Sequence, residues 1–144
     1  MSEAIAIPLI VAGVLIVFPL FWSGIVWIIG TGWRGIAAMY PAEDWPRGGY
    51  TLRAQSARIG ASSYSGVLTF IASEDGLYIR PMLLFRAGHP SIRIPWGAVE
   101  RTEPAMLFGT RVVLADAPDL MVSTKLADAI HAATRAHEDS ASLA

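Results

Sequence analysis

The run from Ala4 to Gly30 constrains this chain most, because it is a single apolar segment too long for the core of a small domain. No ionisable side chain occurs between Glu3 and Arg34. As a helix the run would extend about 40 Å, compared with a hydrocarbon core of roughly 30 Å. A cleavable signal peptide has a basic start and a shorter apolar segment, which this chain lacks. We therefore expect a retained transmembrane anchor over residues 1–32.

The basic residues that flank this segment predict its orientation. No Lys or Arg precedes it, whereas Arg34 and Arg47 follow it closely. Cationic residues next to a transmembrane helix favour the cytoplasmic side. The sequence therefore predicts an N-terminus outside and a C-terminal domain in the cytoplasm.

Composition and motif spacing favour a protein that is not an enzyme. The net charge is −1, so the chain lacks the broad basic surface of nucleic-acid binders. The absence of cysteine excludes disulfides, thiolate metal sites and a cysteine nucleophile. His131 and His137 have a spacing that separates them on a helix, and His89 lies in a Gly-His-Pro turn that we expect to be solvent-exposed. We expect no catalytic residue, no metal and no cofactor.

Residues 33–50 are predicted to connect the anchor to the next domain. Gly30, Gly32 and Gly35 match the GxGxxG spacing of dinucleotide sites, but that motif requires a preceding strand. Gly30 and Gly32 are more typical of the point where an apolar helix meets the headgroups. From Trp33 to Tyr40 the pattern predicts a helical stretch that either continues the anchor or forms a short juxtamembrane helix, and the proline-containing stretch that follows predicts a linker.

Residues 51–138 predict a small, mainly-β domain of about seven strands, folded as a partly closed barrel. Ser73 to Gly76 has the composition of a hairpin turn. Thr124 is the expected cap of a C-terminal amphipathic helix that ends near His137, and residues 139–144 are expected to form a polar tail. The apolar positions of these elements predict a core of Leu68, Phe70, Leu77, Ile79, Ile92, Ile94, Trp96, Val112, Leu114, Leu120, Val122, Leu126 and Ile130.

The segment 80–86 allows two interpretations. Four consecutive apolar residues favour a buried strand. Because arginines bracket them, they also fit a loop that enters the membrane interface while the guanidinium groups meet phosphates. In that second interpretation, the candidate membrane-interface contacts are Trp33, Arg34, Arg80, Met82, Leu83, Leu84, Phe85 and Arg86.

Several short motifs carry a family resemblance. The runs 74–80 (EDGLYIR), 85–90 (FRAGHP) and 94–96 (IPW), together with Val99, resemble small uncharacterised bacterial single-pass membrane proteins with a pleckstrin-homology-like (PH-like) domain. The resemblance implies a bacterial inner (cytoplasmic) membrane and a domain that binds lipid headgroups or proteins. It implies no catalytic activity. The single arginine of residues 58–64, Arg58, differs from the basic first loop of phosphoinositide-binding relatives.

The expected function is thus a membrane-anchored, non-enzymatic PH-like interaction module that recruits a protein partner at the membrane surface. The alternative is a lipid-headgroup or interface-binding module that uses residues 80–86, and the remote alternative is an enzyme. Expected partners are the lipid bilayer, an unidentified membrane or cytoplasmic protein and, through the small pairs Ala12-Gly13 and Ser23-Gly24, a second copy of the chain. No nucleic acid is expected.

Overall fold

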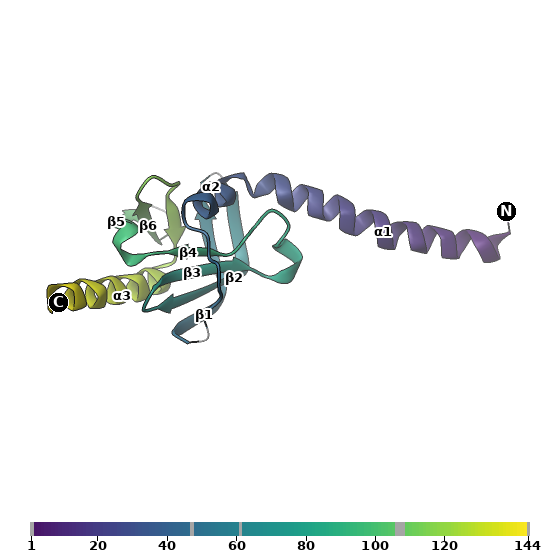
Figure 1. Ribbon diagram of the computed structural model, residues 1–144. Helices are drawn as coiled ribbons and strands as arrows, with labels where there is room; N and C mark the ends of the chain where they lie inside the picture. Colours follow the sequence, from purple (N-terminus) through teal and green to yellow (C-terminus); the bar gives the residue numbers. More distant parts are fainter. Residues whose placement is uncertain (1, 47, 61, 106–108, 144) are drawn as a thin grey trace.

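A long apolar helix projects from one side of a curled β domain (Figure 1). The computed structural model describes residues 2–46, 48–60, 62–105 and 109–143. Helix α1 (Glu3–Ile29) has a mean hydropathy of 2.7 over its 18-residue window, and none of that window is buried. The prediction of one helix long and apolar enough to cross a membrane is confirmed. Arg47, one of the two arginines used for the orientation, lies outside the described residues.

Helix α2 (Thr31–Met39) follows α1 after Gly30 and packs against the domain. Trp33, Ile36 and Ala37 are spaced to share one face of α2, and all three belong to the buried core cluster. The segment predicted as a juxtamembrane helix is therefore part of the packed domain.

In the described part of the chain, seven antiparallel strands form one curled sheet in the order β4-β3-β2-β1-β7-β6-β5. Because β1 pairs with both β2 and β7, the first strand joins the two halves of the sheet. The prediction of a mainly-β domain of about seven strands in a partly closed barrel is confirmed as one curled antiparallel sheet. The strands are β1 (Tyr50–Ile59), β2 (Ser62–Ser73), β3 (Gly76–Pro81), β4 (Ile92–Ile94), β5 (Val99–Ala105), β6 (Gly109–Leu114) and β7 (Leu120–Val122).

The hairpin predicted at residues 73–76 joins β2 to β3. Gly76 has a φ of 151°, and a Cβ there would collide with the carbonyl oxygen of Ile94. The turn therefore requires glycine for both its backbone conformation and its close approach to β4.

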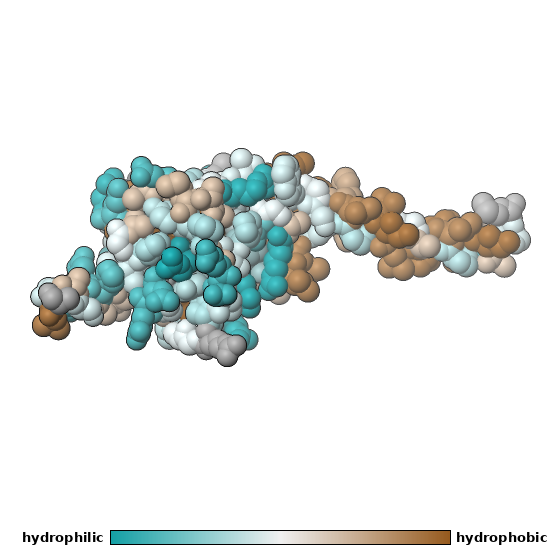
Figure 2. All heavy atoms as spheres, viewed as in Figure 1, coloured by the Kyte–Doolittle hydropathy of each residue, from teal (hydrophilic) through white to brown (hydrophobic). Residues whose placement is uncertain are grey.

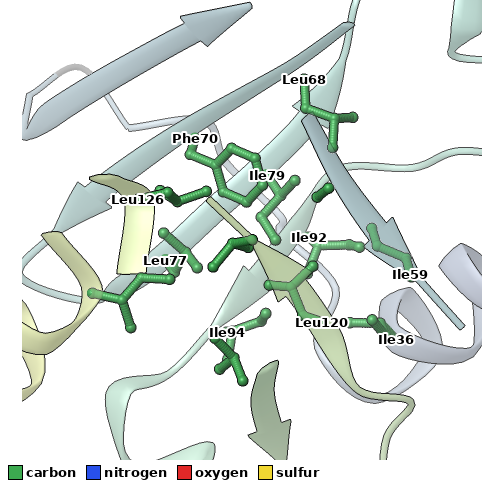
Figure 3. Close-up of a cluster of buried hydrophobic side chains, with 14 of the residues drawn as sticks. Ile36, Ile59, Leu68, Phe70, Leu77, Ile79, Ile92, Ile94, Leu120 and Leu126 are labelled. Carbon is green, nitrogen blue, oxygen red and sulfur yellow. The ribbon is translucent and has the colours of Figure 1, made fainter. Parts of the chain in front are cut away.

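The core lies inside the curl of the sheet, where strands and helices contribute apolar side chains (Figure 3). All thirteen predicted core residues are buried. The core also contains residues that the sequence pattern did not predict, among them Trp33, Ile36, Leu52, Ile59 and Tyr64.

Helix α3 (Thr124–Leu143) closes the fold at the C-terminus. Ser123, not Thr124, caps it, because the Ser123 hydroxyl accepts a hydrogen bond from the Leu126 N–H at 3.3 Å. Leu126 and Ile130 are buried, whereas His137 is exposed, so the buried stripe ends before His137. The segment predicted as a polar tail is helical through Leu143.

Candidate membrane interface

The segment after β3 is an exposed apolar turn, so the favoured interpretation of a buried strand is wrong. Met82, Leu83 and Leu84 are 52%, 75% and 70% exposed. Residues Leu83–Phe85 form a 3₁₀ turn, η1, in which the Phe85 N–H donates to the Met82 carbonyl. A short apolar run has no period that distinguishes a buried strand from an exposed turn, which explains the error.

This apolar turn lies against the C-terminal part of α1. The Trp22 Nε1–H donates to the carbonyl oxygen of Leu84 at 2.9 Å, and the Trp22 and Phe85 rings meet edge to face with centroids 5.5 Å apart. Trp22 precedes the end of α1 by seven residues, or about 10 Å. Figure 2 accordingly shows a hydrophobic patch on the side of the domain from which α1 projects.

Polar contacts fix the end of α1 to the domain. The guanidinium of Arg34 lies over the Trp27 ring at 4.1 Å and donates to the Trp27 carbonyl. The Ser62 hydroxyl donates to the Ile29 carbonyl at 2.8 Å. These contacts connect α1, α2 and β2, and they leave Arg34 half-buried at the junction.

Two residues of this region are buried where the sequence suggested exposure. His89 is only 2% exposed, so its predicted position in solvent is wrong. Trp33, a candidate interface contact, is fully buried, and its Nε1–H donates to the Pro90 carbonyl at 2.7 Å. Gly88, with a φ of 66°, turns the chain in front of His89. The contact partners of both rings are distant in the sequence, so no local pattern indicates them.

His89 has one defined tautomer in this environment. Its Nδ1–H donates to the Ala87 carbonyl, which leaves Nε2 to accept from the Tyr64 hydroxyl; both distances are 2.8 Å. Burial lowers the pKa of His89; the Ala87 hydrogen bond opposes this shift and the Arg34 charge adds to it. Burial raises the pKa of Tyr64 to about 12, against smaller opposite effects of Ser62 and Arg34. Both groups are therefore neutral at physiological pH.

Arginine side chains flank the apolar turn on both sides. Arg80, at the end of β3, lies over the Trp45 ring at 4.1 Å. Arg86 follows the turn, and its Nε–H donates to the Pro81 carbonyl at 3.2 Å. Exposed apolar side chains between cationic ones are typical of a surface that contacts a bilayer.

A second surface feature is a groove of about 1000 Å³ beside α3, lined partly by Glu74, Asp75, Trp96, Ala136 and His137. Within the described part of the chain, no group of three or more histidine, aspartate or glutamate residues could hold a metal ion.

The comparisons with known proteins give no relative. No family model matches the sequence, and neither the curated proteins nor the solved structures include a match.

Proposed function

We propose that this protein is a single-pass, membrane-anchored, non-enzymatic interaction module with a PH-like domain that sits on the bilayer surface. The observation that carries the proposal is the exposed turn at Met82, Leu83 and Leu84, which is fixed to the apolar helix by the Trp22 hydrogen bond. In an anchored protein, this turn reaches the interfacial region of the membrane. The curled seven-stranded sheet and the C-terminal helix support the PH-like assignment.

The length of α1 agrees with this position. Its 27 residues extend about 40 Å, which exceeds the hydrocarbon thickness by roughly 10 Å. The distance along the helix axis from Trp22 to Ile29 is also roughly 10 Å. If the N-terminal part of α1 fills the hydrocarbon, the bilayer surface falls near Trp22, and the Leu84 carbonyl lies at that level. Tryptophan is enriched at this depth.

The energetics favour insertion of the turn. A leucine side chain that leaves water for an apolar environment gains about 1.5–3 kcal/mol. Three such side chains on one turn would contribute on the order of several kcal/mol, enough to hold a tethered domain against the bilayer. The surrounding arginines can remain at the headgroups.

Recruitment of a protein partner is the second candidate function. The groove beside α3 favours it, because its lining combines apolar residues such as Trp96 with the polar side chains of Glu74, Asp75 and His137. Helix α3 lies on the opposite side of the domain from α1 (Figure 1), so the groove would stay accessible in a domain seated on the bilayer.

A depth measurement on the full chain tests the proposed function. The chain has no cysteine, so Leu84→Cys gives a single labelling site and leaves the Leu84 backbone carbonyl in place. In phosphatidylcholine vesicles, we expect a fluorophore at this position to be quenched by lipid-borne nitroxides and protected from aqueous iodide.

Ser140→Cys provides the control, because Ser140 lines the groove beside α3. Its label should show the reverse pattern in vesicles. Equal iodide quenching at the two positions would contradict the proposal. Protection of the Ser140 label in native membranes, but not in vesicles, would support the protein-partner function.

A further inference from the structure

Two arginines lie on the outer face of the sheet, and a third follows the apolar turn. Leu52 and Ile79 are buried in the core, so Arg53 and Arg80, the next residues along β1 and β3, project to the opposite face. Arg86 comes from the loop that follows β3, two residues after Leu84. The cluster therefore borders the surface proposed to meet the membrane.

The strand register places Arg53 and Arg80 on either side of β2. Phe70 pairs with Leu52 on β1 and with Ile79 on β3, while Thr69 pairs with Arg80. Arg53 follows Leu52 at a β-bulge of β1, where pairing with β2 resumes at Gln55. The two arginines therefore lie about two strands, or roughly 10 Å, apart at the backbone, a gap that their long side chains can bridge. Burial lowers the pKa of Arg80, and the nearby charges of Arg86 and Arg53 act in the same direction.

No carboxylate neutralises this cluster among the described residues. The ion pairs that the structure describes use Arg101 and Arg111, on the other half of the sheet. Arg80 stacks on Trp45, an arrangement that holds the guanidinium plane and leaves its N–H edges available. Arg86 uses its Nε–H on the Pro81 carbonyl and keeps its two terminal nitrogens for a ligand. Three unneutralised guanidinium groups in one place favour a bound anion.

We infer that Arg53, Arg80 and Arg86 bind the phosphate of an anionic phospholipid headgroup. Guanidinium groups donate paired hydrogen bonds to phosphate oxygens, and three of them suit a tetrahedral anion. The inference rests on the proposed function, because a domain seated on the bilayer brings this cluster to headgroup level. Zwitterionic lipids offer the same phosphate next to a cation, so the cluster should select anionic lipids over them.

Energy transfer to labelled lipids tests this selectivity in the full chain. A donor at Leu84→Cys is used in phosphatidylcholine nanodiscs that contain a small fraction of acyl-labelled phosphatidylglycerol or acyl-labelled phosphatidylcholine. We expect at least about threefold enrichment of phosphatidylglycerol near the donor at low salt, since each arginine near an anionic headgroup adds roughly a fivefold factor before screening. The enrichment should fall at about 1 M salt.

Two variants with the same change in net charge distinguish lipid selection by this cluster from a general effect of positive charge. In Arg53→Gln/Arg80→Gln/Arg86→Gln, the enrichment should disappear. In Arg58→Gln/Arg101→Gln/Arg135→Gln, which removes three exposed arginines elsewhere, it should persist. Equal energy transfer to both lipids in the parent protein would overturn the inference and is the result expected if the cluster binds an acidic protein segment. Enrichment that survives the Arg53, Arg80 and Arg86 substitutions would also overturn it.

Quenching of the same Leu84→Cys label by lipid-borne nitroxides reports whether the domain is folded and seated on the bilayer. Nitroxide quenching without lipid selectivity would therefore overturn only the headgroup site. Absence of nitroxide quenching of the label in the parent protein would instead overturn the proposed function.

Discussion

The buried pair of Tyr64 and His89 makes stability sensitive to pH. Burial lowers the pKa of His89 in the folded state below its ordinary value of 6.5. As pH falls below 6.5, the unfolded chain takes up a proton that the folded chain resists, so the free energy of unfolding decreases. We expect a lower unfolding temperature at pH 5 than at pH 7.5, measured by circular dichroism. His89→Gln should reduce this difference, because glutamine keeps a polar side chain without titrating.

His137→Gln is the control, since His137 is exposed and makes no described side-chain hydrogen bond. This variant should keep the full pH dependence of the parent. An unchanged pH dependence in His89→Gln would show that other groups cause the acid destabilisation.

At the residue scale, alternation along strands predicted burial well. Burial that results from long-range contacts could not be predicted from the sequence. Ile92 and Ile94 alternate with polar neighbours, which is sufficient to place them on the core face. Trp33 and His89 are buried because they meet each other and Tyr64, with ring centroids 5.3–5.5 Å apart. No periodic pattern links three residues so far apart in the sequence.

At the element scale, α2 should decide whether the domain folds without its anchor. Trp33 is fully buried on α2, and truncation of a buried tryptophan costs about 3–5 kcal/mol. Small domains have about 5–15 kcal/mol of stability in total. We therefore expect a fragment of residues 30–144 to unfold cooperatively in urea, and a fragment of residues 41–144 to be largely unfolded.

Two substitutions in the longer fragment distinguish stabilisation by the packing of Trp33 from stabilisation by the mere presence of α2. Trp33→Ala should lower the urea midpoint strongly, whereas Met39→Ala, at an exposed position on the same helix, should change the free energy of unfolding by less than about 0.5 kcal/mol. A stable, cooperative 41–144 fragment would show that the sheet and α3 are sufficient.

Strands with turn residues at their ends were predictable, and the connection after β3 was not. Ser73 to Gly76 indicated a hairpin because glycine provides the backbone conformation that the turn needs. The pairing of the β3 segment with β2 ends at the hydrogen bond from the Met82 N–H to the Val67 carbonyl. The chain then closes a 3₁₀ turn, which directs residues 82–86 outward. That outcome depends on the partner strand, so the local sequence could not determine it.

At the scale of the whole molecule, the apolar helix was predictable from composition, but its contact with the domain was not. The Trp22 indole and the Leu84 carbonyl are 62 residues apart in the sequence. Their hydrogen bond places the apolar turn at one height along α1, and therefore at one depth in the proposed membrane. The candidate contacts at residues 80–86 followed from local chemistry, whereas Arg53 comes near them only because β1 and β3 both pair with β2.

The orientation of the anchored protein is the last prediction. When the chain is produced in a bacterium, we expect its C-terminal domain in the cytoplasm, because Arg34 closely follows α1. A fluorescent protein fused after residue 144 should therefore be fluorescent, and alkaline phosphatase fused there should be inactive. The reverse pair of results would establish the opposite orientation. Arg34→Gln combined with Arg47→Gln should increase the fraction of inverted molecules, whereas Arg101→Gln combined with Arg135→Gln should not, because those arginines lie far from the span.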